Sequence, residues 1–454
     1  MAKYRFTTTD ITTGQPLGTD LPINGQNASM QISGIGSFGG TLQLLTEDTS
    51  AVIRAANVAA VEPWKSVLWV LQNNAPIWAG PVTGWQPSSA MDGNLAFQAS
   101  TMESLLQYRL LRDQAVQYSV VAGSGTSPRT AIQVASPQIA SFLPVTIDDS
   151  GNSTSTGTYL VYDVVSGTDV FDLVRAVVNY AVNKPITDPS NNTLAIPSAA
   201  VKVASLIFST TNESGITIQN TGDVKIDPAQ GQSCYDFINS LASTYGFEWC
   251  IQPGLTSSGS LAMTLTLGAP TLGRLFTDTG FQFNYPSYTT IDYVWTRQAQ
   301  NPTNAVYSTG SSADNSNTAI SQYPYGFDTD ELSQGYALLE QVGTMPTPAS
   351  ENDTTAQNQV NAYAAGQVLN QSVLGQLTPS VLLGPDAYPT LSQIQVGDQA
   401  MLTATSQLHP ADQNTGAPGL QVLTRITSWN LTFPGTNSTE TNQVYLADIS
   451  QVVA

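Results

Sequence analysis

The sequence predicts a mainly β fold with a few helices, a β-rich α+β chain in two similar halves. Short segments that alternate large and polar side chains recur along the 454 residues, which is typical of strands with one face on a core and one in water. Helical periodicity is confined to a few segments. Because 41% of residues are hydrophobic and only 10% are charged, the composition indicates folded domains rather than disorder.

The first hundred residues are predicted to be mostly strands. Residues 4–9 alternate large and polar side chains. The apolar runs 67–71 and 77–80 flank Asn73-Asn74, and because asparagine tolerates positive φ, this arrangement predicts a hairpin. A helix is expected from Met102, with leucines at helical spacing. Further strands are expected at 29–32, 41–45 and 95–99.

Helices and strands alternate in the rest of the chain. Apolar residues at helical spacing predict a helix from about Val170, a second over 234–244 that Gly246 ends, and a third over 357–374. The predicted inward faces are Phe171, Val174, Val177 and Val178; Phe237, Ile238 and Leu241; and Val360, Tyr363, Ala364 and Leu369. The predicted strands are 247–251, 261–267, 291–295, 425–427 and 443–446.

Composition shifts divide the chain into four parts. Residues 1–112 are expected to form a first β-barrel with a helix, and 113–214, rich in Gly, Ser, Thr and Pro, an inserted α+β domain. Residues 215–375 are expected to form a helix-containing β domain with a mobile polar loop near 308–320. Residues 376–454 would supply closing barrel strands. No short repeat is visible.

Charge and residue counts exclude several functions. The chain carries 33 Asp and Glu against 14 Lys and Arg, a net charge of -19, whereas a DNA reader needs a basic face. Two cysteines and one histidine exclude a disulfide framework, a Cys-rich zinc site and a multi-His site, so no metal or other cofactor is expected. The start lacks the apolar core of a signal peptide, and the absence of about 18 consecutive apolar residues predicts no membrane insertion.

Three local patterns have both a chemical and a structural interpretation. Gly34–Gly39 reads GxGxxG, but strand-like residues follow where a dinucleotide site needs a helix, so a turn between strands is expected. Cys234 and Cys250 could form a bridge, and two buried thiols are the favoured interpretation. His409 lacks the GxSxG context of a hydrolase, so an exposed loop histidine is expected.

Acidic clusters give no clear catalytic or metal-binding signature. Some carboxylates adjoin aromatic residues that could stack on a sugar ring, yet among so many acids chance proximity is expected. Other Asp-containing loops depart from the DxDxDG spacing of calcium sites. The first group is Asp328, Asp330 and Glu331 with Tyr323, Tyr325 and Phe327, and the second is Asp148-Asp149 and Asp314-Asn315. No catalytic, cofactor-binding or metal-ligating residue is therefore assigned, and the chain is not expected to be an enzyme.

The order of motifs in the first quarter of the chain resembles the minor tail proteins of siphophages that infect actinobacteria. That family opens with F-x-x-T-D-x-x-T-G and continues through G-x-F-x-G-x-L and P-x-W-G-G to a helix that ends near an arginine. The matching residues are Phe6–Gly14, Gly36–Leu42, Pro76–Gly80, where Ala79 replaces a glycine, and Ser104–Arg109. Val396-Gly397-Asp398 and Arg425-Ile426-Thr427 are similar to the closing barrel of tail-hub proteins.

The resemblance implies a structural virion protein, a trimeric tail hub at the tip of a phage tail. Such a hub holds two tail-tube-like β-barrels per subunit, so the homotrimer presents six-fold pseudo-symmetry. Its implied partners are the distal tail protein or tail tube, the tape-measure protein, and spike or fibre (receptor-binding) proteins. DNA would pass through during ejection without specific binding, along an acidic or neutral lumen. The implied location is the virion tail tip, after assembly in the host cytoplasm.

Two other functions and one interface expectation accompany this interpretation. Tyr-rich loops at 285–293 and 323–327 leave open a host-receptor or carbohydrate-binding tail protein, and a cell-wall hydrolase is the remaining alternative. Four tryptophans, at positions 64, 69, 78 and 85, supply apolar area in or near the first barrel. Strand alternation places most of them in the core, and one or two are expected at subunit seams.

Overall fold

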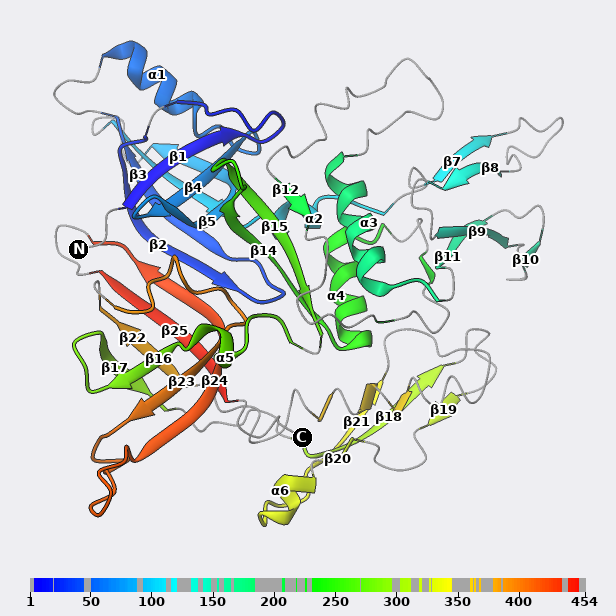
Figure 1. Cartoon of the computed structure of the whole chain (residues 1–454). Helices are drawn as coiled ribbons and strands as arrows, with labels where there is room; N and C mark the ends of the chain where they lie inside the picture. The colour runs from blue at the N-terminus through cyan, green and yellow to red at the C-terminus, as the bar shows by residue number, and fades with distance from the viewer. Residues whose placement is uncertain are drawn as a thin grey trace.

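In the computed structural model the chain is mainly β, with one long curled sheet and a helical layer beside it (Figure 1). Among the described residues, no helix is both long and apolar enough to cross a membrane. The structure describes residues 4–18, 20–44, 50–87, 93–111, 116–120, 132–137, 142–147, 153–154, 159–164, 167–183, 206–208, 218, 225–226, 231–269, 271–295, 303–311, 318–320, 326–327, 329–344, 360–361, 363–364, 367–368, 379–384, 387–434 and 440–448.

Six strands near the N-terminus form the first barrel, in blue at the upper left of Figure 1. They pair in the order β1-β4-β5-β6-β3-β2. The segment that links β1 to β2 lies along β1, where Leu21 N donates to Phe6 O at 2.8 Å and Pro16 bridges Thr9. The strands are β1 (Tyr4–Asp10), β2 (Ile23–Gln31), β3 (Ser37–Gln43), β4 (Ser66–Gln72), β5 (Ala75–Pro87) and β6 (Asn94–Ser100).

The hairpin of the first barrel is confirmed. Strands β4 and β5 are antiparallel neighbours, joined by Asn73 at φ 51° and Asn74 at φ 70°. Positive φ at both central residues matches the right-handed twist of the flanking strands, so the two asparagines fix the turn. Every residue of β4 is buried, whereas β5 is buried over its first half and exposed at its end.

Six later strands form the second barrel, in green and orange-red at the lower left of Figure 1. They are β16 (Gln282–Tyr285), β17 (Thr290–Val294), β22 (Ser380–Leu383), β23 (Gln399–Ala404), β24 (Leu420–Thr432) and β25 (Thr441–Asp448). Their order is β16-β23-β24-β25-β22-β17. The barrel thus combines two strands before residue 295 with four after residue 379.

A helical layer lies to the right of the first barrel in Figure 1. It contains the predicted helices α3 (Val170–Asn183) and α4 (Cys234–Tyr245). Ser233 accepts from Asp236 N at the start of α4, and Gly246 ends it at φ 66°, where glycine is favoured. The helices share an apolar core with a sheet of order β12-β15-β14. Its strands are β12 (Leu206–Phe208), β14 (Glu248–Leu255) and β15 (Leu261–Gly268).

Two short helices flank the first barrel. The predicted helix from Met102 is only α2 (Glu103–Gln107), because Leu110 leaves the helix and bridges Ser233. The other helix, α1 (Ala51–Ala59), was not predicted. None of its residues is buried, and Val58 is partly buried where it packs against the core. Ser50 caps it by accepting from Ile53 N.

Small sheets occupy the other side of the molecule (Figure 1). Their strands are β7 (Val116–Val120), β8 (Ile132–Pro137), β9 (Phe142–Ile147), β10 (Ser153–Thr154), β11 (Tyr159–Val164), β13 (Lys225–Ile226), β18 (Ala305–Ser311), β19 (Thr318–Ile320), β20 (Gly326–Phe327) and β21 (Glu340–Thr344). The two remaining helices with defined bounds are α5 (Phe276–Thr279) and α6 (Thr329–Ser333).

The predicted polar loop at 308–320 is wrong at both ends. Its first residues belong to β18 and its last to β19, which pair antiparallel from Thr309–Ile320 to Ser311–Thr318. Thr and Ser are compatible with strands when pairing satisfies their backbone groups, so polarity alone misassigned them. In the region predicted as helix 357–374, the described residues between 360 and 368 are helical, and Val360 and Ala364 are buried as predicted.

Candidate assembly interface

The glycines of the N-terminal motif lie where two backbones meet. A Cβ built at Gly36 would collide with Ser29 O, and one built at Gly80 would collide with Ser100 O. Glycine is therefore required at both positions for steric reasons. Between them, Phe38 is 2% exposed and stacks within 5.5 Å of Trp78 and of Phe97. The motif residues thus build the core of the first barrel.

The two barrels join within the chain through β2 and β24. Residues 27–31 pair antiparallel with residues 428–432, which places Met30 opposite Trp429. Both side chains are buried, at 5% and 2% exposure. Phe433, just past β24, enters the first barrel and lies 5.0 Å from Tyr4 and 5.5 Å from Phe6, measured between ring centroids. One apolar core therefore runs through both barrels.

Both barrels use the same strand order. Numbered by position in the chain, the six strands of each barrel are arranged 1-4-5-6-3-2. Four of the five strand pairs are antiparallel in both barrels. The pair of the first and fourth strands differs, since β1 and β4 are antiparallel whereas β16 and β23 are parallel. The chain is therefore built of two like β-units.

The equivalence of the barrels extends to single residues of their fifth strands. β5 and β24 are both 13 residues long. Each has a register shift against its sixth strand, between Val82 and Gly84 in β5 and between Ile426 and Ser428 in β24. A tryptophan follows directly in both strands, Trp85 and Trp429. No sequence signal pointed to this match, because the strands share pairing geometry and little sequence.

The exposure of the tryptophans divides them into two groups. Trp69 and Trp78 are fully buried in the first barrel, as expected for core residues. Trp64 is 38% exposed and Trp85 is 37% exposed. Trp64 packs edge-on against Tyr108, with ring centroids 4.9 Å apart. Trp85 is thus a partly exposed tryptophan whose counterpart, Trp429, is covered by β2.

Two ion pairs hold the second barrel to its neighbours. Asp398 is fully buried, and its carboxylate accepts from Arg274 Nη2 at 2.6 Å, from Arg274 N at 3.0 Å and from Gln395 N at 2.8 Å. Each of these charge-assisted hydrogen bonds is accepted by a buried carboxylate oxygen, so Asp398 has a structural role and holds the surrounding segments in place. Arg425 binds Glu248, which ties β24 to β14. Asp398 and Glu248 both bind groups of the protein itself, which indicates that they position neighbouring segments.

Glu103 of α2 is another deeply buried carboxyl group. Its Oε1 accepts from Ile251 N at 2.7 Å and so links α2 to β14. Burial raises the pKa of Glu103 above its usual range, since it penalises the charged form.

The structure places the residues that were weighed for chemistry. Gly34–Gly36 lie in the turn from β2 into β3, and Ser37–Gly39 begin β3, so the expected turn between strands is confirmed. Cys234 and Cys250 are buried and form no disulfide, which confirms the two-thiol interpretation. His409 lies in a loop as predicted but is only partly exposed, because its Nδ1 is 2.9 Å from Tyr293 Oη and its ring lies 6.0 Å from that of Trp295.

The acidic candidates are largely outside the described residues. Tyr323, Tyr325, Asp328, Asp148-Asp149 and Asp314-Asn315 fall there, and the side chains of Asp330 and Glu331 are not described. Within the described part of the chain, no group of three or more His, Cys, Asp or Glu residues is placed to hold a metal ion.

Comparison with known proteins finds no matching family model and no matching curated protein. Among solved structures, the chain is similar to a tail protein from Neisseria meningitidis MC58, with a TM-score of 0.49 and 9% identity over 98% of this chain and 96% of that chain. It is also similar to the 43 kDa tail protein of prophage MuSo2 from Shewanella oneidensis, with a TM-score of 0.47 and 10% identity over 97% of each chain. A third is the prophage tail protein gp18 from Listeria monocytogenes EGD-e, with a TM-score of 0.45 and 9% identity over 98% of this chain and 95% of that chain.

Proposed function

We propose that this chain is a structural phage tail protein that forms a trimeric hub at the tail tip. The observation that carries the proposal is the duplicated strand order, 1-4-5-6-3-2, in two barrels of one polypeptide. Three copies of a chain with two like units offer six like positions, which is what a hexameric neighbour requires. The resemblance of the N-terminal motifs implies that the hub holds three copies of the chain and lies at the tail tip.

The proposed partners are those that the resemblance implies. One side of the ring would dock on the distal tail protein or tail tube, and the other would meet the tape-measure protein and spike or fibre proteins. The net charge of -19 suits a passage for DNA, because like charge disfavours contact with phosphates. We expect the surface that faces the passage to be acidic or neutral.

The hub function is tested by assembly of the full-length chain. Native mass spectrometry, alone and with the tube or distal tail protein of the same phage, should give a trimer, and electron cryo-microscopy of the complex should give a three-fold ring with six barrels. A chain that stays monomeric both alone and with these partners would refute the hub function. A ring whose passage is lined by Lys and Arg would refute the proposed DNA path.

A second candidate function is receptor or carbohydrate binding, favoured by two exposed tyrosines. Tyr288 is 90% exposed and Tyr388 is 60% exposed. Their loops, after β16 and β22, adjoin, since Gly384 N donates to Thr289 O at 2.9 Å. Exposed aromatic rings can stack on sugars. Binding of the full chain to host cells that is lost in Tyr288→Ala, with assembly intact, would support this function; unchanged or absent binding would refute it.

A further inference from the structure

Strand β5 has one open edge near its end. β4 pairs with it up to Pro81, and the last backbone bond on that side is from Trp64 N to Val82 O at 2.8 Å. β6 pairs with residues 82–87 on the opposite edge. Among the described residues, none pairs with the β4 side of residues 83–87. Their backbone therefore offers a ladder for another strand.

The equivalent edge of β24 is occupied. β23 pairs with it up to Arg425, and Gly397 N then donates to Ile426 O at 2.7 Å, as Trp64 N donates to Val82 O in the first barrel. From Ser428 onward the same edge pairs with β2 of the first barrel, while β25 holds the other edge. The pairing of β2 with β24 is thus an example, within the chain, of this edge occupied by a strand.

The side chains at the open edge have the exposure expected of a contact surface that lacks its partner. Trp429 is 2% exposed, because β2 and the first barrel cover it, whereas Trp85 at the equivalent position is 37% exposed. A groove of about 350 Å³ adjoins Trp85 and is lined by uncharged residues, among them Gly39, Gly84 and Gln98. A partly exposed tryptophan beside an uncharged groove is a typical anchor of a protein contact.

The strand that would fill this edge is identified by the repeat. In the intact junction the donor is β2, the second strand of the first barrel, and the second strand of the second barrel is β17. Within the described residues β17 pairs only with β22. Ile291 and Val294 of β17 are 51% and 50% exposed, and Trp295 follows directly. The apolar end of β17 therefore has the place and character of a donor strand.

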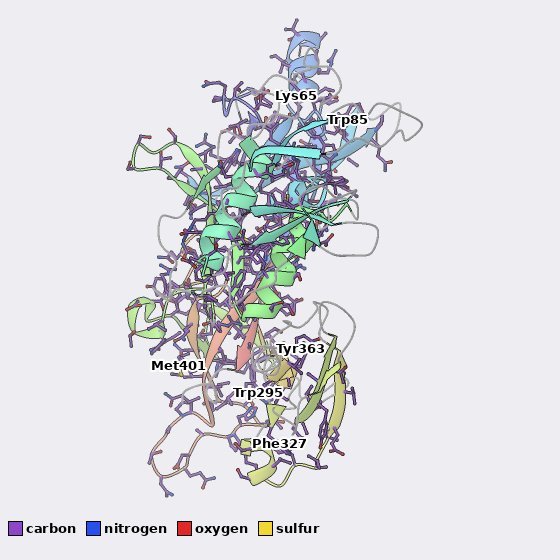
Figure 2. All side chains as sticks on the ribbon, turned by 90° about the vertical axis from the view of Figure 1, so that its right-hand side faces the viewer. Lys65, Trp85, Trp295, Phe327, Tyr363 and Met401 are labelled. Atoms are coloured by element: carbon purple, nitrogen blue, oxygen red, sulfur yellow. The ribbon has the colours of Figure 1, made fainter. Side chains whose placement is uncertain are left out.

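The two surfaces cannot meet within one molecule. Figure 2 shows Trp85 in the upper part of the molecule and Trp295 in the lower part. A contact between two different patches of identical chains is head-to-tail, and it closes into a ring when the rotation permits. The occupant is therefore a second copy of this chain.

We propose that residues 83–87 of β5 receive the end of β17, at Val294 and Trp295, from a second copy of the chain, in the way that residues 428–432 receive β2. The proposal rests on the proposed hub function and adds the residues of its subunit seam. The seam repeats the internal junction, so all six contacts around a trimer would be alike.

The direct test is site-specific photo-crosslinking of the full-length chain. Benzoylphenylalanine replaces Gln86 at the open edge, and the control places it at Leu408, which is 73% exposed on a loop of the second barrel. We expect the Gln86 probe to join two chains, with mass spectrometry locating the second attachment at β17 or Trp295. Attachment elsewhere, or no product above the Leu408 control, would overturn the proposal.

Charged substitutions give an independent test. Trp85→Arg and Val294→Arg should each weaken association of the chains roughly tenfold or more, whereas Leu408→Arg should leave it unchanged. Circular dichroism confirms that each variant is folded. If wild-type trimers persist in both seam variants, the seam is wrong and the hub function stands. If the wild-type chain forms no trimer even with its tail partners, the hub function itself fails, and the seam with it.

Discussion

The equivalent tryptophans Trp85 and Trp429 allow a quantitative test of the duplicated architecture. A buried tryptophan removes about 200 Å² from water, worth about 5 kcal/mol at about 25 cal/mol per Å². Trp429 is 2% exposed, so Trp429→Ala should lower the free energy of unfolding by about 3–5 kcal/mol. Trp85 is 37% exposed, and Trp85→Ala should cost the isolated chain about 2–3 kcal/mol.

The exposed part of the Trp85 side chain should contribute to stability once the chains assemble and bury it. Burial of its exposed third would add about 2 kcal/mol per contact, a roughly 30-fold effect on association. Urea unfolding followed by circular dichroism, at a concentration where the chain is monomeric and again where it is assembled, measures both contributions. Equal losses for the two variants in the monomer would refute the assigned environments. An assembled Trp85→Ala chain as stable as wild type would refute an anchoring role for Trp85.

Three further predictions concern single anchors of the fold. Burial raises the pKa of Glu103, so the contribution of this group to stability is present below about pH 4.5 and is lost as pH rises through the higher folded pKa. The melting temperature of Glu103→Gln should therefore rise relative to that of the wild type from pH 5 to pH 8. A difference in melting temperature that stays constant with pH would contradict this. Asp398→Asn should lower the free energy of unfolding by about 3 kcal/mol, against about 0–1 kcal/mol for Asp20→Asn at an exposed ion pair. Gly80→Ala should lower the melting temperature because its Cβ meets backbone, whereas Gly84→Ala in the same strand has open space and should not; similar melting temperatures would show that β5 is placed incorrectly.

Local signals in the sequence were sufficient for the elements that carry their own punctuation. Asn73-Asn74 predicted a turn that the structure confirms with positive φ at both residues. Ser233 and Gly246 bracket α4, and the apolar face of that helix is buried as predicted. These elements are determined by neighbours in sequence, so alternation, caps and turn residues identify them.

The rest depends on partners that are distant in sequence. The strand order of the second barrel requires β16 and β17 to join strands beyond residue 379, which no local pattern encodes. The match between Trp85 and Trp429 appears only once strand pairing is known. α1 was not predicted; none of its residues is buried, and Val58 is only partly buried against the core.

The placement of Phe433 has a consequence for biosynthesis. This ring follows Tyr4, Phe6 and Phe38 by hundreds of residues, yet it fills the space among them, so it leaves the ribosome long after they do. The core of the first barrel therefore stays incompletely filled until residue 433 has been translated, because contacts so remote along the chain form late. A translation product that stops shortly before residue 433 would lack this ring. Its first barrel would be less well packed, and cellular quality control would meet a loosened domain instead of a subunit able to assemble.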